Sequence, residues 1–158
     1  MVSLNWCFKQ KEGIKAIEPN ENLAESYIKM AENALGTMNR EAKHNLVFSI
    51  SACYYSTYYS LYAIMGQIGI KCEIHSCSIK FMETFLSSLY TKSDEDIIKK
   101  AFKLRNIAQY YVDRIIDKED VDFIIKGAPD FVAKSKEILS KLNETHIKEI
   151  RQKVVDNK

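Results

Sequence analysis

Glycine and proline are scarce in this sequence, which has 5 and 2 of them among its 158 residues. Both residues interrupt regular elements, so their scarcity argues against a loop-rich chain. Lys, Glu, Ile, Leu and Ala are plentiful instead, which is typical of helices joined by short connections. The composition predicts an all-α protein, and the length is that of one domain that can bury a core without metal or disulfides.

Long apolar runs and an excess of one charge are also lacking. No run approaches the roughly 18 apolar residues that span a bilayer, and the N-terminus lacks the charged, apolar, small-residue order of an export signal. The sequence therefore predicts no membrane segment and a cytoplasmic protein. The net charge of +2 does not by itself indicate nucleic acid as the partner, because Lys and Glu are interleaved along the chain. Any anion site has to be local.

Paired CxxC cysteines are absent as well. The chain has four cysteines, Cys7, Cys53, Cys72 and Cys77. We expect free thiols, because no export signal points to an oxidising compartment. A zinc site is the alternative, since Cys72, His75 and Cys77 surround one turn and Cys7 would complete a tetrahedral set if the N-terminal arm folded back. The spacing fits no common zinc module, so we expect no metal and no other cofactor.

An N-terminal arm, residues 1–19, is expected to precede a helical bundle. Pro19 ends the arm because it pushes Glu18 out of helical geometry, and Asn20 is a suitable N-cap for the first helix. The pattern predicts an up-and-down bundle of about four or five helices. The first two helices are expected over residues 20–39 and 41–68. A third should have Ser76 or Ser78 as its N-cap and end near Tyr90. A fourth should run from a capping box of Ser93 and Asp96 to about Ile116, and a last one from Asp117 or Lys118 to about Leu142.

Two features complicate the C-terminal part. Pro129 removes one backbone hydrogen bond, so a kink or break is expected near Gly127 in the last helix. Residues 143–158 are highly charged and have only a thin apolar stripe, Ile147, Ile150 and Val154. A frayed extension, a partner-docking helix and a disordered tail all fit this segment. The expected organisation is therefore an arm over 1–19, a bundle over 20–142 and a charged tail or helix extension over 143–158.

The second helix has two apolar faces at helical spacing, so we expect it at the centre of the bundle. One face is Val47, Ile50, Tyr54, Tyr58, Leu61 and Met65, and the other is Phe48, Ala52, Tyr55, Tyr59 and Tyr62. The remaining edge carries the small groups Ser49, Ser56, Ser60 and Ala63. Small groups allow close approach of another backbone or of a ligand, but the same pattern fits an edge that faces water.

The fourth helix has the pattern most suggestive of function. Its core stripe is predicted to be Ile97, Ala101, Leu104, Ala108, Tyr111 and Ile115. A second set, Ile98, Phe102, Arg105, Asn106, Gln109 and Tyr110, mixes large apolar groups with Arg and amides, where a solvated face would carry Lys and Glu. Aromatic groups and Arg are enriched at interface centres, so a partner subunit is the simplest cover, and a self-complementary patch predicts a two-fold dimer.

Such a dimer would bring two Arg105 side chains together. Their approach is costly unless an anion or hydrogen-bond acceptors lie between them. A phosphate group fits, because the planar guanidinium binds it bidentately while Asn106 and Tyr110 add neutral hydrogen bonds. The alternative is an Arg105 whose stem packs at the edge of the core and whose head lies in water.

Several segments together resemble one known family. Residues 105–110, Arg-Asn-Ile-Ala-Gln-Tyr, are similar to a motif of Arg, a polar residue, variable positions and then His, or in many prokaryotic members Ala-Asp-Tyr. The aromatic run over 52–59 and the turn ending at His75 also match that family's layout. On these residues the chain resembles the HEPN family (higher eukaryotes and prokaryotes nucleotide-binding), and its opening, Trp6-Cys7 to Pro19-Asn20, resembles an uncharacterised archaeal branch.

The resemblance implies a bundle that dimerises through the motif helix and pairs with a small nucleotidyltransferase, as a toxin with its antitoxin. Active toxins of the family are metal-independent endoribonucleases whose Arg and His line a cleft at the dimer interface. In some pairs the nucleotidyltransferase silences the toxin by adenylylating a Tyr near the motif. Here that residue would be Tyr110 or Tyr111.

The chain departs from the family motif at two positions. Tyr110 replaces the catalytic His, and a phenol that titrates near about 10 is a poor base for RNA cleavage compared with an imidazole near about 6.5. Gln109 replaces the Asp of the Ala-Asp-Tyr variant, which removes another candidate base. Among the other imidazoles, His44 and His146 are expected at the surface, while His75 either shares the site or caps the following helix.

Two hypotheses follow. In the first, a homodimer binds RNA or a nucleotide at a cleft of Arg105, Asn106, Gln109, Tyr110 and His75, with Arg105 and Tyr110 as a degenerate catalytic pair and with weak or lost ribonuclease activity. In the second, the same surface belongs to a non-catalytic module that only docks subunits and a nucleotidyltransferase.

Overall fold

The computed structural model describes residues 2–111 and 113–158. It is helical apart from one short antiparallel ladder, so the predicted all-α bundle is confirmed. The elements are α1 (Leu4–Lys9), β1 (Lys15–Ala16), α2 (Glu21–Glu41), α3 (Leu46–Ile68), β2 (Ile70–Lys71), α4 (His75–Phe85), α5 (Lys92–Tyr110), α6 (Lys118–Lys141) and α7 (Glu144–Asp156).

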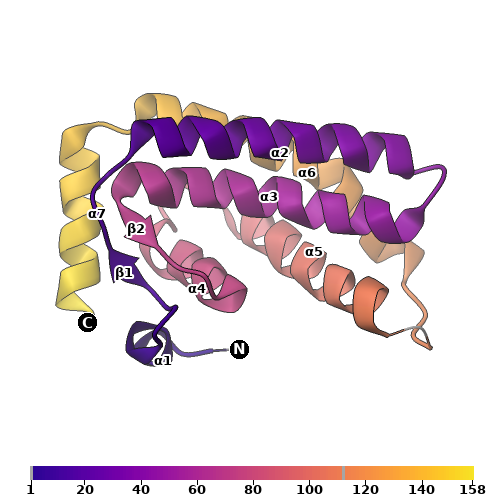
Figure 1. The fold of residues 1–158 in the computed structure, drawn as a ribbon, viewed down its shortest axis with the longest axis horizontal. Helices are drawn as coiled ribbons and strands as arrows, with labels where there is room; N and C mark the ends of the chain where they lie inside the picture. Colours follow the sequence, from indigo (N-terminus) through magenta and orange to yellow (C-terminus); the bar gives the residue numbers. More distant parts are fainter. Residues whose placement is uncertain (1, 112) are drawn as a thin grey trace.

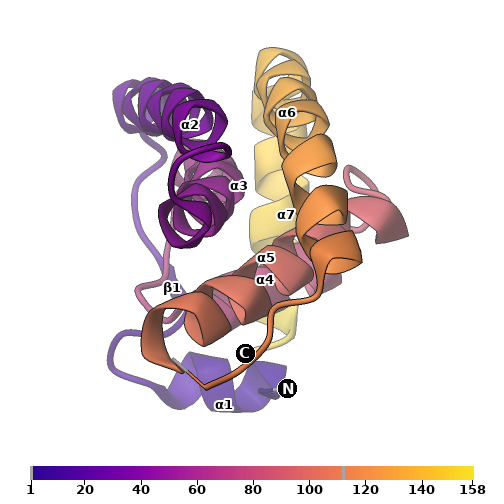
Figure 2. The ribbon, with the colours of Figure 1, turned by 90° about the vertical axis from the view of Figure 1, so that its right-hand side faces the viewer.

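The long helices α2 and α3 form an antiparallel hairpin, and α6 runs alongside it (Figure 1). The end view shows α5 passing beneath α3 and α6, so that α3 lies among α2, α5 and α6 (Figure 2). The short helices α1 and α4 lie below α3, and α7 stands across the end of the bundle where α3 finishes (Figure 1). None of the helices within the described ranges combines the length and apolar character that a bilayer crossing needs.

Helix α3 lies at the bundle centre as predicted, and most of its side chains are buried. Asn45 caps its start by accepting from the Phe48 amide at 3.2 Å, and Gly69 ends it in the left-handed conformation with φ of 80°. The prediction of two buried faces is wrong for the first turn. There Val47 and Phe48 are 39% and 61% exposed. A stripe of apolar residues is buried only where a neighbouring element lies opposite it.

The edge of small residues on α3 is buried, so the interpretation that it faces water is wrong. Ser49, Ser56, Ser60 and Ala63 are all fully buried. The Ser49 hydroxyl donates to the Met38 carbonyl on α2 at 3.0 Å, which shows how closely the two backbones approach. The other two hydroxyls donate within α3 itself, to the carbonyls of Cys53 and Ser56. These short bonds satisfy polar groups that are shut off from water.

Helix boundaries agree with the sequence prediction where one strong cap decides them. Asn20 caps α2 by accepting from the Leu23 amide at 2.9 Å, as predicted. The capping box of α5 is Thr91 with Asp94, not Ser93 with Asp96. Asp94 accepts from the Thr91 amide at 2.6 Å and is also paired with Lys134 of α6. The ion pair between Asp94 and Lys134 favours the capping box of Thr91 and Asp94. Residues close in sequence do not predict this ion pair.

Other boundaries differ from the prediction. Helix α3 starts at Leu46 rather than near 41, and α4 starts at His75 with Ile74 as its N-cap instead of Ser76 or Ser78. Helix α4 ends at Phe85 rather than near 90, and α5 ends at Tyr110 rather than near 116. The helical periodicity continues in the sequence beyond both ends. After Phe85 the chain leaves the helix while Leu86 and Tyr90 stay buried, and Tyr90 stacks on Phe131 of α6. After Tyr110 the side chains of Tyr111 and Ile115 are exposed.

Helix α6 runs through Gly127 and Pro129 as one helix, so the predicted break is absent. At Gly127 the backbone passes so close to α5 that a Cβ atom would lie 2.6 Å from Ile97 Cδ1. Phe131 and Val132, just beyond the proline, are buried in the core. Packing on both sides of Pro129 therefore holds the helix together where one backbone hydrogen bond is missing.

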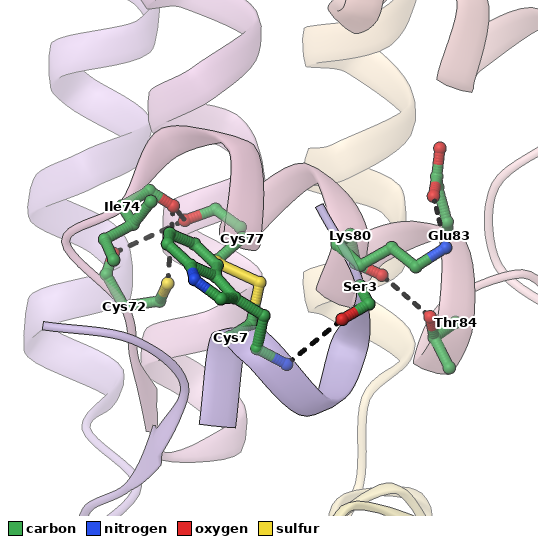
Figure 3. The surroundings of a disulfide bond; sticks show 10 residues. Ser3, Cys7, Cys72, Ile74, Cys77, Lys80, Glu83 and Thr84 are labelled. Carbon is green, nitrogen blue, oxygen red and sulfur yellow. Dashed lines mark hydrogen bonds and ion pairs between the residues drawn. A yellow bond between two sulfur atoms is a disulfide. The ribbon is translucent and has the colours of Figure 1, made fainter. Parts of the chain in front are cut away.

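The prediction of free thiols is wrong for two of the four cysteines. Cys7 of α1 and Cys77 in the first turn of α4 form a disulfide with a Cα–Cα distance of 5.5 Å (Figure 3). The N-terminal arm does fold back onto α4, as the alternative of a zinc site required. Because Cys7 and Cys77 are joined in a disulfide, neither sulfur is available as a zinc ligand. Cys53 and Cys72 are free and buried, and burial raises the pKa of the Cys53 thiol to about 12.

The C-terminal residues 144–156 form α7, which packs on the bundle through buried Ile150 and Val154. Arg151 Nη1 lies 2.9 Å from each of three carbonyl oxygens, those of Ile17, Ile68 and Gly69. Two of these belong to the C-terminal end of α3, where the helix dipole favours a cation. One side chain thus joins α7, the end of α3 and the strand-forming arm.

Removal of the disulfide is expected to lower stability. The bond closes a loop with a sequence separation of 70 residues. A loop of that length stabilises the folded state by about 4 kcal/mol in the chain-entropy account, which corresponds to about 10 °C in Tm. Thermal unfolding with and without a reductant measures the effect. The double variant C7S/C77S is the control, because its Tm should not respond to reductant. A wild-type Tm that does not change with reductant would contradict a stabilising role of the disulfide.

Substitution of Arg151 by Met is expected to loosen α7. The change keeps an apolar stem but leaves three carbonyl groups without their charged donor, at a cost of about 2 kcal/mol. Amide hydrogen exchange should rise over α7 first and over the rest of the bundle less. Lys148→Met on the same helix is the matched control, since its side chain is 79% exposed and should change stability by less than about 0.5 kcal/mol.

Candidate functional site

Arg105 lies near the C-terminal end of α5, and neutral groups hold its guanidinium. Nη2 donates to the Tyr55 hydroxyl at 3.2 Å. Nη1 donates to the Asn106 side-chain oxygen at 3.1 Å and, more weakly, to the Tyr110 hydroxyl at 3.4 Å. Its Cζ lies 5.8 Å and 5.4 Å from the ring centres of Tyr55 and Tyr110, so an aromatic group from α3 and one from α5 both flank the cation.

The charge of Arg105 has no carboxylate partner within residues 2–111 and 113–158 of the chain. Its Nε atom is buried without an acceptor. The side chain is therefore not a head free in water, since three hydrogen bonds fix its position. A fixed, uncompensated guanidinium flanked by hydroxyl and amide groups has the chemistry to accept an anion such as phosphate.

Of the other predicted residues on α5, Asn106 and Tyr110 hydrogen-bond to Arg105 and Gln109 does not. Asn106 is half-buried and orients its oxygen towards the guanidinium. Gln109 donates to the Ser51 hydroxyl of α3 at 3.0 Å, so it ties the end of α5 to the start of α3 instead of pointing at Arg105. Tyr110 is 66% exposed and brings its hydroxyl back over Arg105. The structure thus brings Arg105, Asn106 and Tyr110 together, with Gln109 at the rim.

Tyr55 completes this group and was not predicted as part of it. The sequence placed Tyr55 on a buried face of α3 because it follows the apolar pattern there. In the structure it is only half-buried, and its hydroxyl holds Arg105. The sequence did contain one indication of this role. A Tyr at the edge of a buried face has a hydroxyl that needs a hydrogen-bond partner.

His75 is the first residue of α4 and lies against the same aromatic cluster. Its Nδ1 makes a short hydrogen bond with the Tyr54 hydroxyl, and its ring is parallel to that of Tyr58 with centroids 4.2 Å apart. The ring of Phe102, one turn before Arg105 on α5, lies 6.2 Å away. Burial lowers the pKa of His75, and the nearby charge of Arg105 lowers it further. The imidazole is therefore neutral near pH 7.

The predicted division of α5 into a core stripe and a covered face needs correction. Ile98 is fully buried and Phe102 packs on the core, so the bundle itself covers these two members of the second set. Tyr111 and Ile115, predicted for the core, are 46% and 97% exposed. Both follow the end of the helix at Tyr110, where the helical period no longer decides which residues face inwards.

Exposed apolar side chains cluster around the site. The first turn of α3 contributes Leu46, Val47 and Phe48, and the end of α5 contributes Tyr110 and Tyr111. The hydrogen bond between Gln109 and Ser51 joins these two segments, and both lie at the same end of the molecule (Figure 1). The guanidinium of Arg114 stacks on Tyr111 with its Cζ 4.1 Å from the ring centre. We refer to Leu46, Val47, Phe48, Tyr110 and Tyr111 as the apolar rim.

No group of three or more His, Cys, Asp or Glu side chains that could hold a metal ion occurs in the described part of the chain. The site around Arg105 is built from Arg, Tyr and amide groups, which are donors to anions and poor ligands for metal cations. What this arrangement can do chemically is bind phosphate and orient it next to phenols and one imidazole.

Acid is expected to destabilise the protein through His75. The unfolded chain takes up the proton near pH 6.5, while the folded His75, with its lowered pKa, does not, so stability falls as pH decreases below about 6.5. The carboxylates with lowered pKa, such as Asp94, act only nearer pH 4. Comparison of Tm at pH 7.5 and 5.5 should show a smaller loss in His75→Gln than in wild type. His146→Gln is the control and should keep the wild-type loss.

The family model for the HEPN domain matches residues 24–139 of the sequence. A comparison with curated proteins finds no significant match. The matched segment runs from α2 through most of α6 and contains His75, Arg105 and Tyr110, whose geometry is described above. Because the match covers well over half of the chain, the resemblance seen in the sequence is confirmed and the chain belongs to the HEPN domain family.

Proposed function

We propose that this HEPN protein binds RNA or a nucleotide through phosphate contacts at Arg105, in a cleft completed by a second copy of the chain. The observation that carries the proposal is the guanidinium of Arg105, which is fixed by three hydrogen bonds to neutral groups and has no carboxylate partner among the described residues. Arg151, which has a structural role, donates to three backbone carbonyl oxygens, whereas Arg105 has only side-chain hydroxyl and amide partners and its buried Nε has no acceptor.

The apolar rim supports a dimer with the site at its interface. Phe48 and Tyr110 are more than half exposed, and large apolar groups of this kind beside an Arg are typical of interface centres. A two-fold contact over the rim would place two Arg105 side chains near each other. A phosphate between them removes their repulsion, so ligand binding and dimerisation would support one another.

The proposed partner of the dimer is a small nucleotidyltransferase, as toxin with antitoxin. Tyr110 suits modification, because its hydroxyl is on an exposed side chain within 3.4 Å of Arg105 Nη1. An adenylyl group on that oxygen would bring a phosphate onto the guanidinium and fill the anion site from within. Tyr111 is exposed as well, but its ring is covered by the guanidinium of Arg114 rather than that of Arg105.

Ribonuclease activity is expected to be weak, or lost, on the residues of the family motif alone. Tyr110 occupies the position of the family's His, and a phenol does not accept a proton readily near neutral pH. Gln109, at the position of the Asp in the other variant, is engaged with Ser51 and carries no titratable group. The second candidate function, a module that only docks subunits and a nucleotidyltransferase, is favoured by the apolar rim and needs no phosphate.

Binding of RNA should depend on Arg105 and on salt. With a labelled single-stranded RNA, Arg105→Ala is expected to weaken binding about tenfold or more. The log–log slope of affinity against salt should fall by about 0.7 for each phosphate that the variant no longer neutralises. Lys148→Ala is the control, because Lys148 is exposed on α7, which stands at the opposite end of the bundle from the last turn of α5 (Figure 1); its affinity should stay within about twofold.

Sedimentation of both variants keeps binding and assembly separate. Loss of RNA binding by an Arg105→Ala protein that is still dimeric supports the anion site. If wild type forms the dimer but binds no RNA or nucleotide at any salt concentration, the docking module is the correct function.

A further inference from the structure

An RNA-cleaving site needs a group that accepts a proton near pH 7, and the described α5 motif supplies none. The buried tyrosines of the neighbouring aromatic cluster are unsuited, because burial raises the pKa of Tyr54 and of Tyr58 well above the usual range of a phenol. Arg105 itself stays protonated. The one imidazole in this cluster comes from another helix, α4.

The ring of His75 is fixed in orientation. Tyr58 lies parallel to it with an interplanar angle of 0°, and Phe102 lies beyond at 6.2 Å with an angle of 22°. Nδ1 is engaged by the Tyr54 hydroxyl. Nε2 makes no hydrogen bond within residues 2–111 and 113–158, and the side chain is half-buried rather than enclosed. When Nδ1 carries the proton and donates it to the Tyr54 oxygen, the lone pair of Nε2 is free to accept one.

His75 and Arg105 belong to one cluster. Tyr54, which bonds His75, is adjacent in sequence to Tyr55, which holds Arg105, and their rings lie 5.4 Å apart. Phe102 lies three residues before Arg105 on α5, and its ring centre is 6.2 Å from that of the same imidazole, so His75 lies beside α5 about one helical turn before Arg105. The charge of Arg105 is close enough to influence the titration of His75.

We infer that His75 is the general base of this site, taking from α4 the part that the α5 motif lacks. The inference rests on the proposed function, since it requires RNA whose phosphate is bound at Arg105. Nε2 of His75 accepts the proton of a ribose 2′-hydroxyl as that oxygen attacks phosphorus. The P–O5′ bond breaks and its oxygen takes a proton from the Tyr110 hydroxyl. The products are a 2′,3′-cyclic phosphate and a 5′-hydroxyl, and the imidazolium returns its proton through water to the Tyr110 oxygen.

The charged and titratable groups around His75 fit this role. From α3 it faces Tyr54 and Tyr58, both neutral, and from α5 it feels Arg105. The hollow beyond Ser76 and Phe102, with a volume of about 250 Å³, also has Lys80, Lys99 and Glu83 in its lining, and both lysines pair with that glutamate. Among residues 2–111 and 113–158 no carboxylate pairs with the imidazole to stabilise its charged form, so the imidazole stays unprotonated and available as a base near pH 7.

The test uses the full-length protein and a short oligonucleotide of deoxynucleotides with one internal ribonucleotide, in the presence of a metal chelator. Wild type is expected to cut after the ribonucleotide and to leave a cyclic phosphate. His75→Gln should lower the cleavage rate about 100-fold or more, while its affinity for the all-deoxy oligonucleotide stays within about twofold of wild type. His44→Gln and His146→Gln are the matched controls and should cleave at the wild-type rate.

The pH profile separates catalysis from a structural role. The wild-type rate should rise with pH to a plateau that begins below about 6.5, and this limb should vanish in His75→Gln. Tyr54→Phe removes the partner of Nδ1 and is expected to reduce the rate about tenfold while keeping a shifted limb, because Tyr54 is a positioning residue.

An NMR measurement on the wild-type protein tests the role of His75 without depending on whether a variant folds. Addition of uridine 3′-monophosphate should shift the imidazole resonance of His75 more than those of His44 and His146. A His75→Gln protein that cuts at the wild-type rate, or a wild type that binds RNA through Arg105 and never cuts it, would overturn the inference and leave the proposed function standing. A wild type that binds no RNA would overturn both.

Discussion

The burial of α3 on all sides is the constraint on which the rest of the structure depends. From Ser49 to Ile68 this helix has almost no stretch that faces water, so every other long helix is placed by the surface it shares with α3. Small groups let α2 approach on one side, where Ser49 reaches the backbone of α2 directly. Aromatic groups fill the other side, and their hydroxyls have to find partners at its margin. The candidate site is built from two of those hydroxyls, of Tyr54 and Tyr55, with His75 and Arg105 as the partners.

Composition and period were sufficient for the fold class, the central position of α3 and the N-cap of α2. These features depend on residues close together in sequence or on a regular pattern. The capping box of α5 shows where local reasoning stops, because two overlapping boxes fit the sequence and the ion pair of Asp94 with Lys134, forty residues away, accompanies the one that forms. Likewise, the helical period continues past Tyr110 in the sequence. The sequence does not reveal which helices pack on α5, so it could not show that the buried part of α5 ends before Tyr110.

Only the site residues on one helix, α5, could be predicted from the sequence. Arg105, Asn106 and Tyr110 share a face of α5 by spacing, so their meeting follows from helical geometry. Tyr55 and the ring contacts of His75 depend on how α3 and α4 meet α5, which no spacing within one element reveals. The Cys7–Cys77 bond was missed for the same reason. A sequence separation of 70 carries no geometric information until the arm is known to fold under α4.

That bond has a topological consequence. It turns residues 7–77 into a closed covalent ring that contains the whole of α2 and α3, while α5, α6 and α7 belong to a linear chain attached at one point of the ring. A single peptide-bond break anywhere inside the ring leaves one connected molecule, whereas a break after it releases everything downstream that packing does not retain. The central helix is thus held both by its neighbours and by covalent closure, whereas the segment that carries Arg105 and Tyr110 lies outside the ring and is held by noncovalent contacts alone.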